Sequence, residues 1–86
     1  MTPAQCRAAR ALLNWSQLQL AGRASVSVTT VRNFERGASG MMRNNLAALR
    51  AVLQAEGIEL LDGDEGEGVR RRDRRRPAEI VAEQAA

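Results

Sequence analysis

Residues 16–37 read SQLQLAGRASVSVTTVRNFERG, and this stretch decides the fold of the chain. Ser16 and Ser27 are each followed by apolar residues at helical spacing, which is the pattern of a serine that caps a helix N-terminus. Gly37 stands where a glycine commonly ends a helix. The stretch therefore predicts two short helices, one after each serine, with a tight turn between them.

Further helices are expected on both sides of this pair. Thr2 and Gln5 have the spacing of a capping box at the start of a first helix, and apolar residues recur at helical spacing after them. After a loop over residues 38–43, Asn44 or Asn45 is expected to cap a fourth helix that carries a clear apolar stripe. The fold class is therefore expected to be mainly α, with four helices.

Residues 58–72 carry the pattern of a short C-terminal β-hairpin. Two apolar runs flank an acidic, glycine-rich turn over residues 62–68, which favours two antiparallel strands. Because a lone hairpin is barely stable in water, its apolar residues must cover the helices or meet a second chain. We expect a homodimer in which Ile58, Leu60 and Val69 form the contact. Packing against the chain's own helices is the alternative.

The 86 residues are expected to form one small domain. Residues 1–57 form its helical part and residues 58–72 the hairpin. Residues 73–86 are basic at first and then rich in alanine and glutamate, and we expect them to be a frayed helix or a disordered tail. A domain of this size buries only about 60% of its unfolded surface, so association with a second copy would help it.

Positive charge is concentrated in the helical part of the chain. The net charge is +3, and every basic residue is an arginine. Residues 1–56 hold seven arginines against two glutamates, about +5, and the remainder holds six arginines against eight acids, about −2. A basic domain suits a polyanion such as a nucleic acid, although an ordinary solvated surface has the same charge.

The composition argues against several other classes of protein. There is no histidine, and Cys6 is the one cysteine, so neither an internal disulfide nor a Cys/His metal site is expected. We expect no cofactor, no small-molecule ligand and no enzyme activity. No stretch reaches the roughly 18 apolar residues of a membrane span, and the N-terminus lacks the apolar core of a signal peptide. A cytoplasmic protein with no membrane contact is expected.

The second helix of the central pair has a face suited to DNA. Its apolar residues are expected to face the core, which leaves small, polar and cationic side chains exposed: Val28, Thr29, Arg32, Asn33 and Arg36. Asparagine can bridge the edge of adenine, arginine that of guanine, and the methyl groups of valine and threonine can meet that of thymine. The preceding helix begins at Ser16 and Gln17, where the helix dipole and free N–H groups favour a phosphate.

A resemblance to a known family rests on a series of residues at fixed spacing. These are Trp15-Ser16-Gln17-Leu18, Leu20-Ala21, Val26-Ser27, Val31 and Glu35-Arg36-Gly37. The series resembles the Cro/phage-repressor (XRE-type) helix-turn-helix family over about residues 5–57. The resemblance implies a lambda-repressor-like fold. It also implies a sequence-specific regulator of transcription, expected to be a repressor, whose partner is double-stranded DNA.

The resemblance also implies roles for individual residues. The positions that read bases are Val28, Thr29, Arg32 and Asn33. The positions that contact phosphate are Ser16, Gln17, Ser27, Arg36 and the loop residue Arg43. Arg10 and Glu35 match a buried ion pair that ties the first helix to the third.

One position departs from the family pattern. The turn between the two central helices usually holds a glycine, where this chain has Ala24 and Ser25. If position 25 requires a positive φ, serine costs about 1 kcal/mol there.

The alternative function is a protein-interaction module, such as an antitoxin or anti-activator. The arginine run over residues 70–76 is either an arm that contacts DNA or a solvated segment neutralised by nearby acids.

Overall fold

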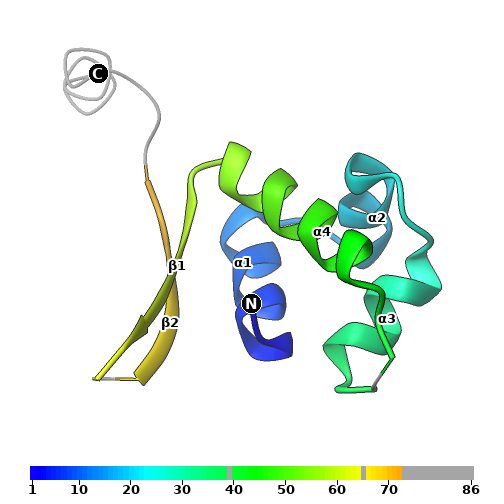
Figure 1. The fold of residues 1–86 in the computed structure, drawn as a ribbon. Helices are drawn as coiled ribbons and strands as arrows, with labels where there is room; N and C mark the ends of the chain where they lie inside the picture. The colour runs from blue at the N-terminus through cyan, green and yellow to red at the C-terminus, as the bar shows by residue number, and fades with distance from the viewer. Residues whose placement is uncertain (39, 65, 73–86) are drawn as a thin grey trace, which may run out of the picture.

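Four helices and a β-hairpin make up the described part of the chain, which covers residues 1–38, 40–64 and 66–72 of a computed structural model (Figure 1). The elements are α1 (Pro3–Leu13), α2 (Gln17–Ala24), α3 (Val28–Glu35), α4 (Arg43–Ala55), β1 (Ile58–Gly63) and β2 (Gly66–Arg71). The predicted fold class, mainly helical with a C-terminal hairpin, is confirmed. The tail predicted over residues 73–86 lies outside the described residues.

The first three helices begin at the caps that their sequence signals indicate. Thr2 closes a capping box with Gln5 at the start of α1, and Ser16 closes a second one at the start of α2. The hydroxyl of Ser27 accepts from the third residue of α3. At its other end α1 stops at Asn14, whose φ of 56° is left-handed, a conformation that asparagine tolerates.

The start of α4 differs from the prediction. Its N-cap is Met42, which makes no side-chain capping bond, and the helix already begins at Arg43. Asn44 and Asn45 therefore lie inside the first turn rather than before it. An asparagine caps only from the position that precedes the helix, where its side chain can reach forward to free N–H groups. The predicted asparagine cap is wrong, and Arg43 is helical rather than a loop residue.

The core is a thin aliphatic layer between the helices. The side chains of Leu20, Val31, Leu49 and Leu53 are fully buried, and Phe34 lies at the edge of the same cluster. The helix α2 packs against both α3 and α4, whereas α1 lies between α3 and strand β2. The hairpin and α3 consequently lie on opposite sides of α1 (Figure 1).

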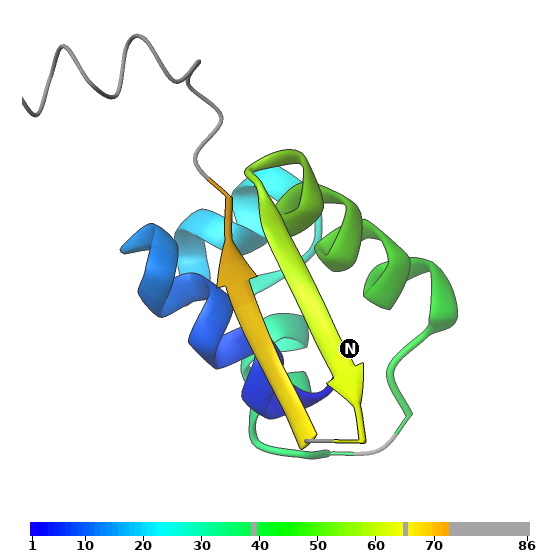
Figure 2. The same ribbon diagram turned by 90° about the vertical axis from the view of Figure 1, so that its left-hand side faces the viewer.

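The hairpin lies across α1 and α4 (Figure 2). Its apolar residues pack against the helical core. The strands are antiparallel, with Leu60 opposite Val69 and Ile58 opposite Arg71. Ile58 is 2% exposed and belongs to the core, and Leu60 and Val69 are half-buried against it. The face that we expected to meet a second chain is therefore packed within its own chain, because the helices offer an apolar surface directly beneath it.

A buried glutamine fastens the hairpin to α1. The side-chain amide of Gln5, in a residue only 2% exposed, donates to the carbonyl oxygens of Leu61 and Gly68 at 3.1 and 3.0 Å and to Asp62 Oδ1 at 3.0 Å. Its oxygen accepts from the backbone N–H of Thr2 at 2.9 Å. The Gln5 side chain thus hydrogen-bonds the backbone at the N-terminus of α1 and the backbone of both strands. The sequence pattern indicated only the first of these roles.

The outer face of the hairpin carries ion pairs. Glu59 pairs with Arg70 and, through Oε1, with Nε of Arg72 at 3.2 Å. The pKa of Glu59 is lowered, first by the hydrogen bond from Arg70. The described part of the basic run is therefore partly neutralised by an acid, and residues 73–76 of the run lie outside the described residues.

We predict that Gln5→Met loosens the hairpin. Methionine keeps the volume of the side chain but leaves a buried polar contact unmade, which costs about 1–3 kcal/mol. Urea unfolding measures the loss. Gln19→Met makes the same chemical change in an exposed capping box and should cost under about 1 kcal/mol. Equal losses in the two variants would contradict the role given to Gln5.

A second prediction concerns the turn between α2 and α3. Ser25 has a φ of 56°, so it holds the left-handed conformation that a side chain disfavours. Ser25→Gly should raise the free energy of unfolding by up to about 1 kcal/mol, whereas Ser25→Ala keeps the side-chain penalty and should bring no gain. Thermal unfolding of both variants checks this, and a gain in the alanine variant alone would contradict it.

Candidate nucleic-acid interface

The turn at Ser25 sets the direction of α3. The backbone N–H of Ser25 donates to carbonyls at the end of α2, and the N–H of Val26 donates to the carbonyl oxygen of Ala21 at 3.0 Å. Ala21 and Ala24 are buried. These contacts close α2 and send the chain directly into the cap of α3. The result is two short helices held at a fixed angle, with one face of α3 turned away from the core.

That outward face of α3 carries polar and cationic side chains. Thr29, Arg32 and Arg36 are exposed, and Asn33 is half-exposed beside them. Val28, which we expected to be exposed, is half-buried and packs against the core. Its methyl groups are thus shared between the core and the surface, because the first residue of α3 lies close to the turn.

Two serine caps lie at the edges of this face. Ser16 Oγ accepts from the N–H of Gln19 at 3.0 Å, and Ser27 Oγ accepts from the N–H of Thr30 at 3.0 Å. Both serines are exposed. Their hydroxyl groups therefore stand at helix N-termini, where the positive end of the helix dipole favours an anion.

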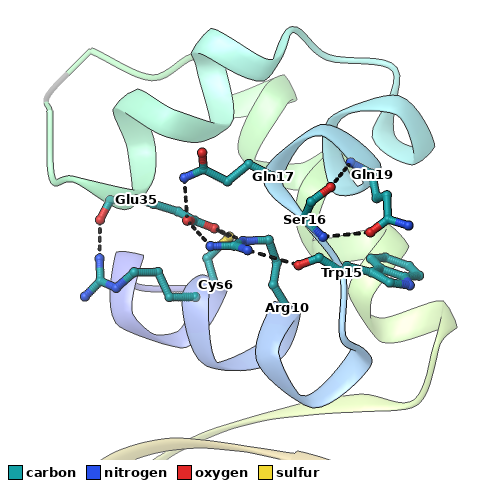
Figure 3. Close-up of polar contacts among 8 residues, drawn as sticks. Cys6, Arg10, Trp15, Ser16, Gln17, Gln19 and Glu35 are labelled. Atoms are coloured by element: carbon teal, nitrogen blue, oxygen red, sulfur yellow. Dashed lines mark hydrogen bonds and ion pairs between the residues drawn. The ribbon is translucent and has the colours of Figure 1, made fainter.

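A buried carboxylate lies behind this surface (Figure 3). Glu35 is only 3% exposed. Arg10 donates to it through two nitrogens, Nε to Oε2 at 2.6 Å and Nη2 to Oε1 at 2.7 Å. Gln17 Nε2 donates to Oε1 at 3.0 Å, and the thiol of Cys6 donates to Oε2 at 3.2 Å. The structure thus brings Arg10 and Glu35 together, as the resemblance implied, and adds two donors.

These contacts govern protonation within the cluster. Burial by itself raises the pKa of Glu35, but the hydrogen bonds from Arg10, Gln17 and Cys6 outweigh it and lower the pKa below the usual value. The same pair raises the pKa of Arg10 through its bond to Glu35. Burial, helped by the neighbouring carboxylate, raises the pKa of Cys6 to about 12. The thiol therefore stays protonated and acts as a donor.

Gln17 has a different contact from the one expected. We expected its side chain to bind phosphate, whereas its amide N–H group donates inward to Glu35. The reason is that Gln17 stands at the start of α2 within reach of a buried carboxylate, whose lone pairs beyond those used by Arg10 also need donors. At the N-terminus of α2, the hydroxyl of Ser16 and the backbone remain on the surface.

An open groove of ≈ 320 Å³ runs beside the cluster and is rich in arginine. Its lining residues are Arg7, Arg10, Gln17, Arg32, Glu35 and Arg36. Glu35 balances the charge of Arg10, so three further guanidinium groups leave the groove positive. The sequence prediction did not include Arg7, which also donates to the carbonyl oxygen of Glu35. Its signal was its spacing of three residues from Arg10, which places both on one face of α1.

The remaining predicted phosphate residue lies at the N-terminus of α4. Arg43 is exposed as the first residue of α4, next to an N-terminus that has no side-chain cap. A small cavity of ≈ 150 Å³ separates this N-terminus from α3, and Thr30, Asn33 and Met42 are among its lining residues. Arg43 thus directly follows Met42, which lines this cavity together with Asn33.

Two capped helices around a tight turn, with a polar and cationic face on the second, define a helix-turn-helix DNA-binding protein. A comparison with protein families matches residues 7–57 to the helix-turn-helix family. The chain belongs to the Cro/phage-repressor (XRE-type) family of helix-turn-helix regulators. A search of the curated proteins found no match. In the described residues, no helix has both the length and the apolar character needed to cross a membrane.

The Glu35 cluster leads to a prediction about acid stability. Because the pKa of Glu35 is lowered on folding, its contribution is complete above the usual value near 4.5 and is lost as the pH falls through the lower, folded value. Glu35→Gln should cost about 3–5 kcal/mol at pH 7, since Arg10 is left without its partner.

Urea unfolding between pH 3 and pH 7 tests this. The Glu35→Gln variant should lack the part of the acid dependence that Glu35 supplies, so the gap between variant and parent narrows as the pH falls. Glu56→Gln removes a carboxylate outside the cluster and serves as the control. A gap for Glu35→Gln that is constant across this pH range would contradict the assignment.

Proposed function

We propose that this protein is a sequence-specific double-stranded DNA-binding repressor that places α3 in the major groove. The observation that carries the proposal is the continuity of two surfaces. The exposed face of α3 and the arginine groove share Arg32 and Arg36, so one side of the molecule offers both base-reading and phosphate-binding groups. An α-helix fits the major groove, where each base pair presents a distinct pattern.

The residues of this surface divide into those that would meet bases and those that would meet phosphates. Thr29, Arg32 and Asn33 stand on the outward face of α3, and Val28 adds the exposed part of its methyl groups. These residues would meet base edges. The phosphate contacts would come from residues around that face: Ser16, Ser27, Arg36, Arg43 and, newly, Arg7.

A homodimer is part of this proposal, but its contact must differ from the one first expected. Ile58 is buried in its own core, so a second copy cannot use it. For the contact we propose instead the outward side of the hairpin, where Leu61 is 40% exposed beside the ion pairs of Glu59. Two reading helices related by a two-fold axis would stand about 34 Å apart, one turn of DNA. Bound in this way, a repressor acts by occluding a promoter.

A protein-interaction module has less support. That function would be favoured by an acidic patch over the basic face of α3. The acids Asp62, Asp64 and Glu67 belong to the hairpin and its turn, which lie on the far side of α1 from α3 (Figure 1). Among the described residues, the basic face has no acidic cover of this kind.

Gel shifts with a selected duplex test the proposal. If the dimer makes about six to ten phosphate contacts, raising the salt concentration from 50 to 200 mM should lower its affinity for DNA by about 10³–10⁵-fold. Arg32→Ala should weaken binding strongly. Arg50→Ala removes the same charge from an exposed position on α4, outside the groove, and should have a small effect.

Two results would count against this interface. Binding that does not depend on salt would remove the phosphate-based mechanism. Equal losses from Arg32→Ala and Arg50→Ala would mean that overall charge, rather than the face of α3, carries the binding.

A further inference from the structure

Asn33, on the outward face of α3, is bonded to Arg36, the C-cap residue that follows the helix. Arg36 Nη2 donates to Asn33 Oδ1 at 2.9 Å, across one turn of helix. Arg36 also lines the arginine groove, whereas Asn33 lines the small cavity toward α4. The bond therefore links a phosphate-binding residue to a base-reading one.

The chemistry of this bond sets the orientation of the amide. A guanidinium has only N–H donors and no acceptor, so the atom that faces Arg36 must be the amide oxygen of Asn33. The NH₂ group then points the other way. Among the described residues, no other hydrogen bond holds the side-chain amide of Asn33. Both members therefore keep N–H groups that no hydrogen bond among the described residues uses.

We infer that Asn33 and Arg36 act as one donor unit that selects guanine in the DNA site. This rests on the proposed function. The major-groove edge of guanine offers two acceptors, N7 and O6, which match two donors. Adenine and cytosine each present an amino group there, and a positively charged guanidinium beside the amide oxygen opposes the approach of another donor.

Arg36 changes the base that Asn33 alone would select. A free asparagine pairs with adenine, accepting from N6 through its oxygen and donating to N7 through its NH₂ group. In this chain Arg36 takes one of the two lone pairs of that oxygen, and its positive charge opposes a second donor such as adenine N6. The identity of residue 36 therefore decides which base residue 33 selects, although Arg36 was expected to serve only as a phosphate contact.

Selection of bound fragments from random duplex DNA tests the inference, with the full chain as the protein. The parent should prefer guanine over adenine by about tenfold or more at one position of each half-site, the scale of a good bidentate contact. Arg36→Met keeps the alkyl stem but frees the amide oxygen, so the preference at that position should change to adenine. The double variant with Asn33→Ala should then lose the adenine preference.

Arg43→Met is the matched control, because it removes another cation of the proposed phosphate contacts without touching Asn33. It should weaken binding to all sequences alike and change no base preference. An Arg36→Met variant that still selects guanine, or that gains no preference for adenine, would overturn the inference while the proposed function stands. Failure of the parent to select any duplex, even at low salt, would overturn both.

Discussion

The carboxylate of Glu35 is the constraint on which the arrangement of the first three helices depends. A charge buried to this degree is tolerated only when its oxygens are fully hydrogen-bonded, and here the donors come from α1 and α2. Arg10 and Cys6 supply three of these bonds, and Gln17 supplies the fourth. Since no single helix could provide them, the orientation of α3 is tied to the other two.

The cluster also determines which charges are available to a ligand. Arg10 is balanced by Glu35, and Gln17 turns its amide inward, so neither offers its full bonding capacity to the surface. The neighbouring arginines of the groove keep their charge. The buried ion pair therefore balances one arginine of the groove of ≈ 320 Å³ and leaves the charge of the others, next to the helix that we propose reads the bases.

The hairpin enlarges the small core that the helices form. Its inner side adds Ile58 to the core and covers α1 and α4, and Gln5 fastens both strands through backbone oxygens. The apolar residues of such a hairpin can pack either on the chain's own helices or on a partner. Here they pack on the chain's own helices, because the four helices leave an apolar surface uncovered.

The sequence by itself determined the features that depend on neighbours in the chain. The caps at Thr2, Ser16 and Ser27 and the helix spacing follow from contacts three or four residues apart, and the hairpin from two apolar runs on either side of one turn; a sequence pattern records both. The tertiary structure decided what depends on distant partners: the inward turn of Gln17, the anchoring by Gln5, the place of Ile58 and the addition of Arg7 to the groove. Residues far apart in the chain compete for the same buried carboxylate or the same apolar surface, and only the packed fold determines which of them reach it.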